Sequence, residues 1–251
     1  MKKQVNIDFA TLNHEVSKYF FSGYDLYFIH GWFCAYLSAL GESEDDLLIP
    51  TYLVLNESAI ENEQHFEGFI GRLVELYTSL AEQLYERNKP LCPLIDVTMP
   101  QKFTRGIIES GDKQNLLNWL VGYLNGYLVI GEDITELNEA DEELMDQRFY
   151  PALFTVCMSL LKLSKEVNLA YLSGSARSNF NDVLEDAAGM WDGDEGSNGV
   201  EQQIAAAIQK VEYNDLISAV NDIFYVIRSC DEIRHSNATG SDLLNTLASR
   251  H

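Results

Sequence analysis

Residues 26–41 read LYFIHGWFCAYLSALG, and this stretch decides the fold because it would make a helix that is apolar on nearly every side. Such a helix has to lie in the middle of a protein, with other helices around it. A second uncharged stretch, residues 114–131, reads QNLLNWLVGYLNGYLVIG. Both approach the length of a membrane span, but histidine, asparagine and glycine interrupt them, which suits buried helices better. We therefore expect two central helices and no membrane segment.

The rest of the chain is dominated by apolar residues spaced three and four positions apart, as in amphipathic helices. The sequence predicts an all-α fold, a compact multi-helix domain with a short C-terminal helical extension. The expected outer helices cover residues 8–21, a short segment opened by Pro50, residues 61–88, 136–150 and 151–165, one or two helices within residues 200–230, and residues 241–251.

Composition divides the chain into three parts. Residues 1–173 carry most of the helical pattern and form the predicted helical domain. Residues 174–199 are rich in glycine, serine, asparagine and aspartate and have no helical periodicity, so we expect an acidic, flexible link. Residues 200–251 follow as C-terminal helices.

Charge narrows the class of partner. The 251 residues include 17 Lys and Arg against 39 Asp and Glu, a formal net charge of −22. Such a surface repels polyanions, so we expect no direct nucleic-acid binding. It favours solubility, and it would steer a basic partner toward the protein.

Cysteine usage and the N-terminus favour the cytoplasm. The four cysteines are far apart and form no C-x-x-C pair, which is typical of free core thiols in a reducing compartment: Cys34, Cys92, Cys157 and Cys230. No apolar signal-peptide run follows Lys2 and Lys3.

His30 is a candidate base or metal ligand inside a central helix. We expect it to gain no acidic or thiol partner from the residues one helical turn away, which are Leu26, Tyr27, Phe33 and Cys34. The chain contains none of the common zinc, nucleophile or phosphate-loop motifs. The sequence therefore predicts a structural histidine and no enzyme, although residues distant in sequence could still form an active site.

No metal or cofactor is expected either. The acidic loop around Asp192 fails the calcium-loop pattern because Gly196, Ser197 and Gln203 stand where an oxygen ligand, a glycine and a bidentate carboxylate are needed. The acidic residues between 132 and 146 are expected to form a solvated helix face.

Gly122 and Gly126 are four residues apart, on one face of a helix, with Trp119 one turn before them. This spacing allows another backbone to approach closely. Because Gly31 is unfavourable in a helix interior, it also indicates a close approach. We expect the two central helices to pack through these glycines, with Trp32 or Trp119 filling the adjoining space.

Three motifs occur in order along the chain: IHGWFCA at residues 29–35, PTYL at 50–53 and WLVGYLNG at 119–126. In this order the chain resembles the YecA/YgfB-like family of bacterial helical proteins over about residues 9–163. The resemblance implies an all-helical cytoplasmic protein with no established catalysis. It marks seven residues as binding or signature positions, for which we expect a packing role: His30, Gly31, Trp32, Trp119, Gly122, Tyr123 and Gly126. Longer members end in a zinc-binding Cys/His tail, which is missing here because only Cys230 and two histidines follow Gly174.

The expected function is that of a non-enzymatic interaction or regulatory protein that binds another protein through its helical domain. Two alternatives stay open. One is an enzyme with a helical pocket around His30, and the other is a structural protein that self-associates as a homodimer.

Overall fold

The computed structural model describes residues 8–20, 25–38, 55–82, 112–129, 139, 141–164, 206, 208–211 and 215–230, and for residues 112–114, 127–129 and 164 only the helical backbone. The elements are α1 (Phe9–Tyr19), α2 (Leu26–Ser38), the 3-10 turn η1 (Glu57–Ala59), α3 (Glu63–Ala81), α4 (Asp112–Val129), α6 (Glu142–Leu144), the π-helical turn η4 (Met145–Phe149) and α7 (Tyr150–Ser164). Residues 215–230 form a further helix.

Among these residues there is no β-strand, only one isolated bridge between Phe20 and Leu55, so the predicted all-α fold is confirmed. The expected helix at Pro50, the link over 174–199, the terminal helix over 241–251 and Cys92 all lie outside the described residues.

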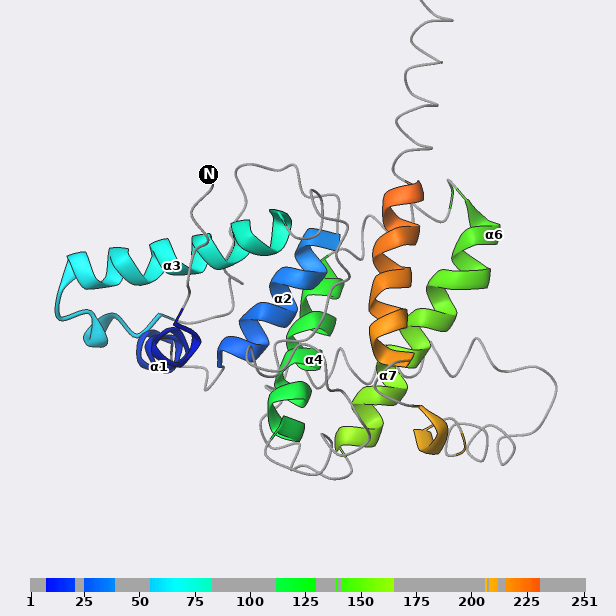
Figure 1. Cartoon of the computed structure of the whole chain (residues 1–251), viewed down its shortest axis with the longest axis horizontal. Coiled ribbons are helices and arrows are strands. Elements are labelled where there is room, and N and C mark those ends of the chain that lie inside the picture. The colour runs from blue at the N-terminus through cyan, green and yellow to red at the C-terminus, as the bar shows by residue number, and fades with distance from the viewer. Residues whose placement is uncertain are drawn as a thin grey trace, which may run out of the picture.

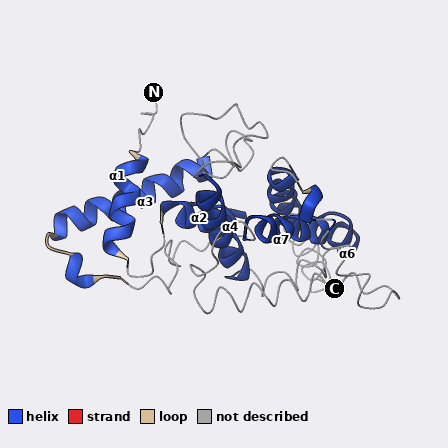
Figure 2. Cartoon of the chain, turned by 90° about the horizontal axis from the view of Figure 1, so that it is seen from below, coloured by secondary structure: helices blue, strands red, loops and turns tan. Residues whose placement is uncertain are grey.

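The helices form three neighbouring groups. Figure 1 shows α1 and α3 at one end, α2 and α4 in the middle, and α6, α7 and the helix over 215–230 at the other end. The contact between α2 and α4 is the most extensive in the described structure; α2 also touches α1 and α3, and α4 touches α7. Every residue of α2 except Tyr27 and Tyr36 is buried, which confirms its central place. The same order of groups is seen from below in Figure 2.

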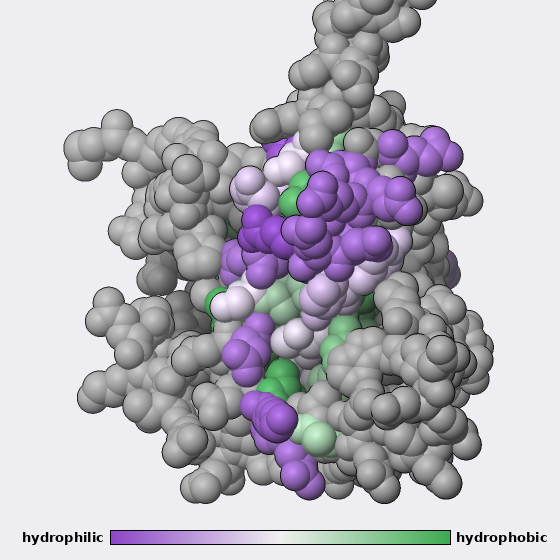
Figure 3. All heavy atoms as spheres, turned by 90° about the vertical axis from the view of Figure 1, so that its right-hand side faces the viewer, coloured by the Kyte–Doolittle hydropathy of each residue, from purple (hydrophilic) through white to green (hydrophobic). Residues whose placement is uncertain are grey.

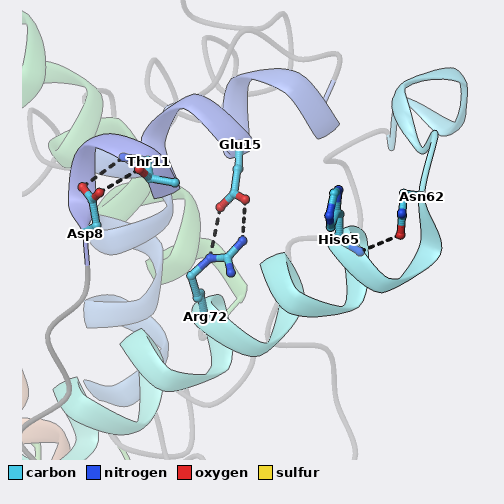
Figure 4. A network of polar contacts seen from close by, with 6 residues as sticks. All are labelled: Asp8, Thr11, Glu15, Asn62, His65 and Arg72. Carbon is cyan, nitrogen blue, oxygen red and sulfur yellow. Dashed lines mark hydrogen bonds and ion pairs between the residues drawn. The ribbon is translucent and has the colours of Figure 1, made fainter.

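Polar side chains cap the beginnings of the outer helices (Figure 4). Asp8 accepts from the N–H groups of Ala10 and Thr11, each at 3.2 Å, and thereby begins α1. Asn62 accepts from the N–H of His65 at 3.1 Å and begins α3. These contacts satisfy N–H groups that have no partner within the helix.

One ion pair joins α1 to α3. Arg72 of α3 binds both carboxylate oxygens of Glu15, with its Nε 3.1 Å from Oε2. Behind this pair the two helices share apolar contacts, in which the rings of Tyr19 and Phe69 lie 5.0 Å apart.

Residues 142–164 form one continuous helical run, whereas the sequence predicted a break between residues 150 and 151. Pro151 has no N–H to donate to the carbonyl of Gln147, and its ring would clash with that carbonyl in an ordinary helix. The turn just before the proline is of the wider π type, with the N–H of Tyr150 bonded to the carbonyl of Met145. The run therefore passes Pro151 without ending.

The helix over 215–230 is joined to this long run. Arg148 pairs with Asp222 and lies 4.5 Å from the ring centre of Tyr225, and Lys162 Nζ donates to the carbonyl of Val211 at 2.6 Å. Figure 3 shows this end of the molecule, where hydrophilic side chains predominate and apolar ones are visible between them. No described helix combines the length and apolar character needed to span a membrane.

Candidate functional site

The contact between α2 and α4 depends on glycines from both helices. A Cβ on Gly31 would lie 2.0 Å from the carbonyl oxygen of Trp119, and one on Gly122 would lie 2.0 Å from that of Phe28. Atoms of two residues never approach so closely without a bond, so any side chain at either position would push the backbones apart. The helix pair expected from the glycine spacing is therefore present.

Gly126 lies further along the same contact. A Cβ there would be 2.7 Å from the Cβ of Ala35 and 2.9 Å from the carbonyl oxygen of Trp32. Both neighbours are short or part of the backbone, so neither can turn away as the end of a long side chain could.

His30 and Trp119 form the main polar contact across the pair. The indole Nε1 of Trp119 donates to Nδ1 of His30 at 2.8 Å, and both residues are buried. Because Nδ1 accepts this bond, the neutral ring carries its proton on Nε2. Burial lowers the pKa of His30 to about 3 from its usual 6.5, so the ring is neutral at physiological pH.

The thiol of Cys34, one helical turn along α2, lies 3.6 Å from the same Nδ1 atom. The expectation that His30 gains no thiol partner from its own helix is therefore wrong. Among the described residues the hydrogen-bond partners of His30 are Trp119 and Cys34, and neither is a carboxylate.

A second polar cluster fixes the beginning of α2. Asp25 accepts from the N–H of Phe28 at 3.0 Å and from Nδ2 of Asn118, on α4, at 2.6 Å. Asn13 of α1 accepts from the N–H of Leu26 at 2.8 Å. Burial raises the pKa of the Asp25 carboxyl, while the bonds from Phe28 and Asn118 act in the opposite direction.

Two buried polar atoms in this contact have no hydrogen-bond partner within the described residues: Trp32 Nε1 and the hydroxyl of Tyr123. Tyr123 stacks on Trp119, with ring centres 5.3 Å apart and an angle of 13° between the rings. Its hydroxyl is next to Ser38, whose own Oγ donates to the carbonyl of Cys34 at 2.8 Å. Burial strongly raises the pKa of Tyr123, so the phenol stays protonated.

The seven signature residues thus lie together in the α2–α4 contact, and all are buried. Sequence reasoning identified these residues and the role of the glycines. It missed the bond between Trp119 and His30, which joins residues 89 positions apart, and the Asp25–Asn118 pair. An aspartate directly before an apolar helix is the signal in the sequence that could have suggested the second pair.

Two of the described cysteines have pKa values raised by burial. Cys34, Cys157 and Cys230 are buried, and none of them forms a disulfide. Burial raises the pKa of Cys157 to about 12, and burial together with nearby Asp141 raises that of Cys230. The described part of the chain also contains no group of three or more His, Cys, Asp or Glu residues arranged to hold a metal ion.

The fold and this site define an all-α protein organised around a glycine-mediated helix pair. The sequence matches no family model, and no curated protein or solved structure is similar enough to count as a match. The resemblance to the YecA/YgfB-like family therefore depends on its three motifs alone.

Proposed function

We propose that this protein is a non-enzymatic interaction or regulatory protein of the cytoplasm, of the YecA/YgfB-like type, that binds another protein through its helical domain. The partner would carry a basic surface, because unlike charges attract the two proteins before contact and stabilise the complex afterwards.

The observation that carries this proposal is where the charges lie. Among the side chains that the structure describes, the exposed bases are Lys18, Arg148 and Lys210. The exposed acids are far more numerous and occur on several helices: Asp8, Glu57, Glu61, Glu63, Glu67, Glu75, Glu139, Glu142, Glu143, Asp146 and Asp215. A surface of this kind attracts basic proteins and repels nucleic acid.

The enzyme alternative has less support. A general base needs access to substrate and a pKa near the working pH. His30 is 4% exposed, its Nδ1 accepts from Trp119, and its pKa is lowered to about 3. These properties suit a group that holds two helices together. Self-association has less support as well, because two copies that each carry a net charge of −22 repel one another.

The proposal is tested by using the full-length protein as immobilised bait in a lysate of the organism that encodes it. We expect a basic protein that is captured saturably, is released by salt and is displaced by free bait. A His30→Gln bait should capture the same protein. If nothing is captured saturably, and the purified protein instead converts a metabolite in a manner that His30→Gln abolishes, the enzyme alternative is correct.

A further inference from the structure

Two glycines of α3 have no explanation within the described structure. Gly31, Gly122 and Gly126 each lie where a Cβ would meet atoms of another helix. In contrast, beyond the adjoining turns of its own helix a Cβ on Gly71 would meet no described atom within 4 Å, and one on Gly68 would meet, among the described residues, the Arg72 guanidinium at 3.6 Å. Glycine is unfavourable in the interior of a helix, and packing within the described structure does not account for two of them within four residues.

The residues around Gly71 form an exposed face. We call Glu67, Gly71, Val74, Glu75 and Thr78 the outer face of α3; all five are exposed, and they lie opposite the buried side of the helix. Val74 is 40% exposed; among the described residues it and Tyr225 are the large hydrophobic side chains that are exposed rather than buried or half-buried. The face therefore offers bare backbone and an apolar side chain next to two carboxylates.

The charge at the end of α3 is not arranged to stabilise the helix, although Glu63 in its first turn is. A helix favours bases in its last turn, yet the last turn of α3 has none and Glu82 follows it. Arg72 is the only lysine or arginine within residues 55–82, and its charge is compensated by Glu15 across the contact with α1. Within residues 55–82 no other lysine or arginine remains to pair with Glu67 and Glu75 of the outer face.

We propose that the outer face of α3 binds an amphipathic helix of the partner protein, with lysine or arginine side chains on either side of an apolar seam. The bases would pair with Glu67 and Glu75, and the seam would pack on Val74 and against the backbone at Gly71, much as α2 and α4 pack on each other. A second copy of the chain does not fit this face, because carboxylates would meet carboxylates. This inference rests on the proposed function and adds the surface and the chemistry of the partner.

The test uses the full-length protein and a fluorescently labelled synthetic helix with lysines flanking a leucine and alanine seam, measured by fluorescence anisotropy. Glu67→Gln combined with Glu75→Gln should weaken binding about tenfold, because two charge-assisted contacts are lost. The matched control, Glu142→Gln combined with Glu143→Gln, removes the same charge from α6 and should change the affinity by less than about twofold. Equal losses in the two pairs would mean diffuse attraction and would overturn the proposal.

Gly71→Gln tests the close approach separately from charge. Its side chain meets nothing inside the protein, so thermal stability should not fall, yet binding of the synthetic helix should weaken about tenfold. Ser218→Gln on the exposed side of the helix over 215–230 is the control, and it should bind as the unaltered protein does. Unaltered affinity in Gly71→Gln would overturn the proposal, as would a dimer, detected by light scattering, that Gly71→Gln dissociates.

The lysate experiment separates this inference from the proposed function. If the unaltered bait captures a partner and the Gly71→Gln bait does not, the results support both the proposed function and the docking surface on α3. Capture that is the same with the Gly71→Gln bait would leave the proposed function intact and refute the docking surface. No capture by the unaltered bait would refute the proposed function itself.

Discussion

The indole nitrogen of Trp119 donates a 2.8 Å hydrogen bond to Nδ1 of His30, so that a side chain of α4 occupies the acceptor atom of the one histidine of α2, which burial keeps neutral. The bond gives a buried acceptor its donor and fixes the ring between the two helices. Its consequences for stability depend on pH.

The neutral state of His30 predicts a loss of stability in acid. The pKa is about 3 in the folded protein against 6.5 for the free side chain, so below pH 6.5 the unfolded chain binds a proton that the folded chain does not. The stability contributed by the neutral ring is therefore complete above pH 6.5 and is lost as the pH falls toward 3, by up to about 1.4 kcal/mol per pH unit.

His30→Gln isolates this effect, because a glutamine oxygen can still accept from Trp119 and does not titrate. We expect the free energies of unfolding of the two proteins to converge as the pH is lowered from about 7.5 to about 5 in chemical denaturation. If the two pH profiles run parallel, His30 takes up its proton as readily in the folded protein as in the unfolded chain, and its pKa is not lowered.

Gly126→Ala is predicted to destabilise the protein. The new methyl group would lie 2.7 Å from the Cβ of Ala35, and relief of that overlap typically costs about 1–3 kcal/mol. The gain in helix propensity, up to about 1 kcal/mol, is too small to compensate. A denaturation midpoint that rises with an unchanged slope would contradict the close packing. Gly126→Leu should be far more damaging or prevent soluble expression.

Gly71→Ala is the matched substitution at a helix glycine with open space around it, and the opposite sign is expected. No other part of the described structure lies within 4 Å of the added methyl group, so only the propensity gain remains. We expect the free energy of unfolding to rise by up to about 1 kcal/mol. A decrease would mean that another part of the chain occupies the outer face of α3.

Asp25→Asn is predicted to leave stability unchanged or to raise it near neutral pH. Because the pKa of Asp25 is raised on folding, its contribution is complete when the carboxyl is protonated and is lost as the pH rises through the folded pKa. Asparagine keeps an oxygen for the N–H of Phe28 and cannot ionise, and its new NH2 group can donate to Asn118 once the Asn118 amide turns its oxygen toward it. Asp25→Ala removes the cap and should cost about 0.5–2 kcal/mol. Thermal melts at neutral pH should show a higher melting temperature for Asp25→Asn than for Asp25→Ala. If both variants lose the same stability, the negative charge of Asp25 is itself needed.

Tyr123→Phe should be neutral or stabilising. The hydroxyl is buried and has no hydrogen-bond partner among the described residues, and an unsatisfied buried polar group costs about 1–3 kcal/mol. Phenylalanine preserves the stacking on Trp119 and removes that cost. A loss of more than about 1 kcal/mol in chemical denaturation would indicate that the hydroxyl is bonded in solution, for instance to Ser38 or to water.

Much of the fold was predictable because its signals are local. The all-round apolar character of residues 26–38 gave the central helix, and the spacing of Gly122 and Gly126 gave the face on which it packs. The wide turn before Pro151 was not predictable, since proline more often ends a helix; two residues of that turn, Met145 and Phe149, are buried in the core.

The polar contacts of the site were less accessible to sequence reasoning. A histidine in an apolar helix indicates that a partner is needed, but not which residue provides it. The donor lies 89 positions away and depends on how α2 and α4 cross. The exposure of Gly71 could not be predicted either, because a tightly packed glycine and an exposed one look the same in a sequence.

α2 and α4 touch in the fold but lie far apart in the sequence, which has a consequence for synthesis on the ribosome. At about 5–20 residues per second, the 89 positions between His30 and Trp119 take roughly 5–20 s to translate. During that interval α2, almost all of which is buried in the finished protein, has no α4 to cover it. The nascent chain therefore exposes an apolar helix that a chaperone could bind, and conditions that slow translation between residues 38 and 112 should increase aggregation of the new protein.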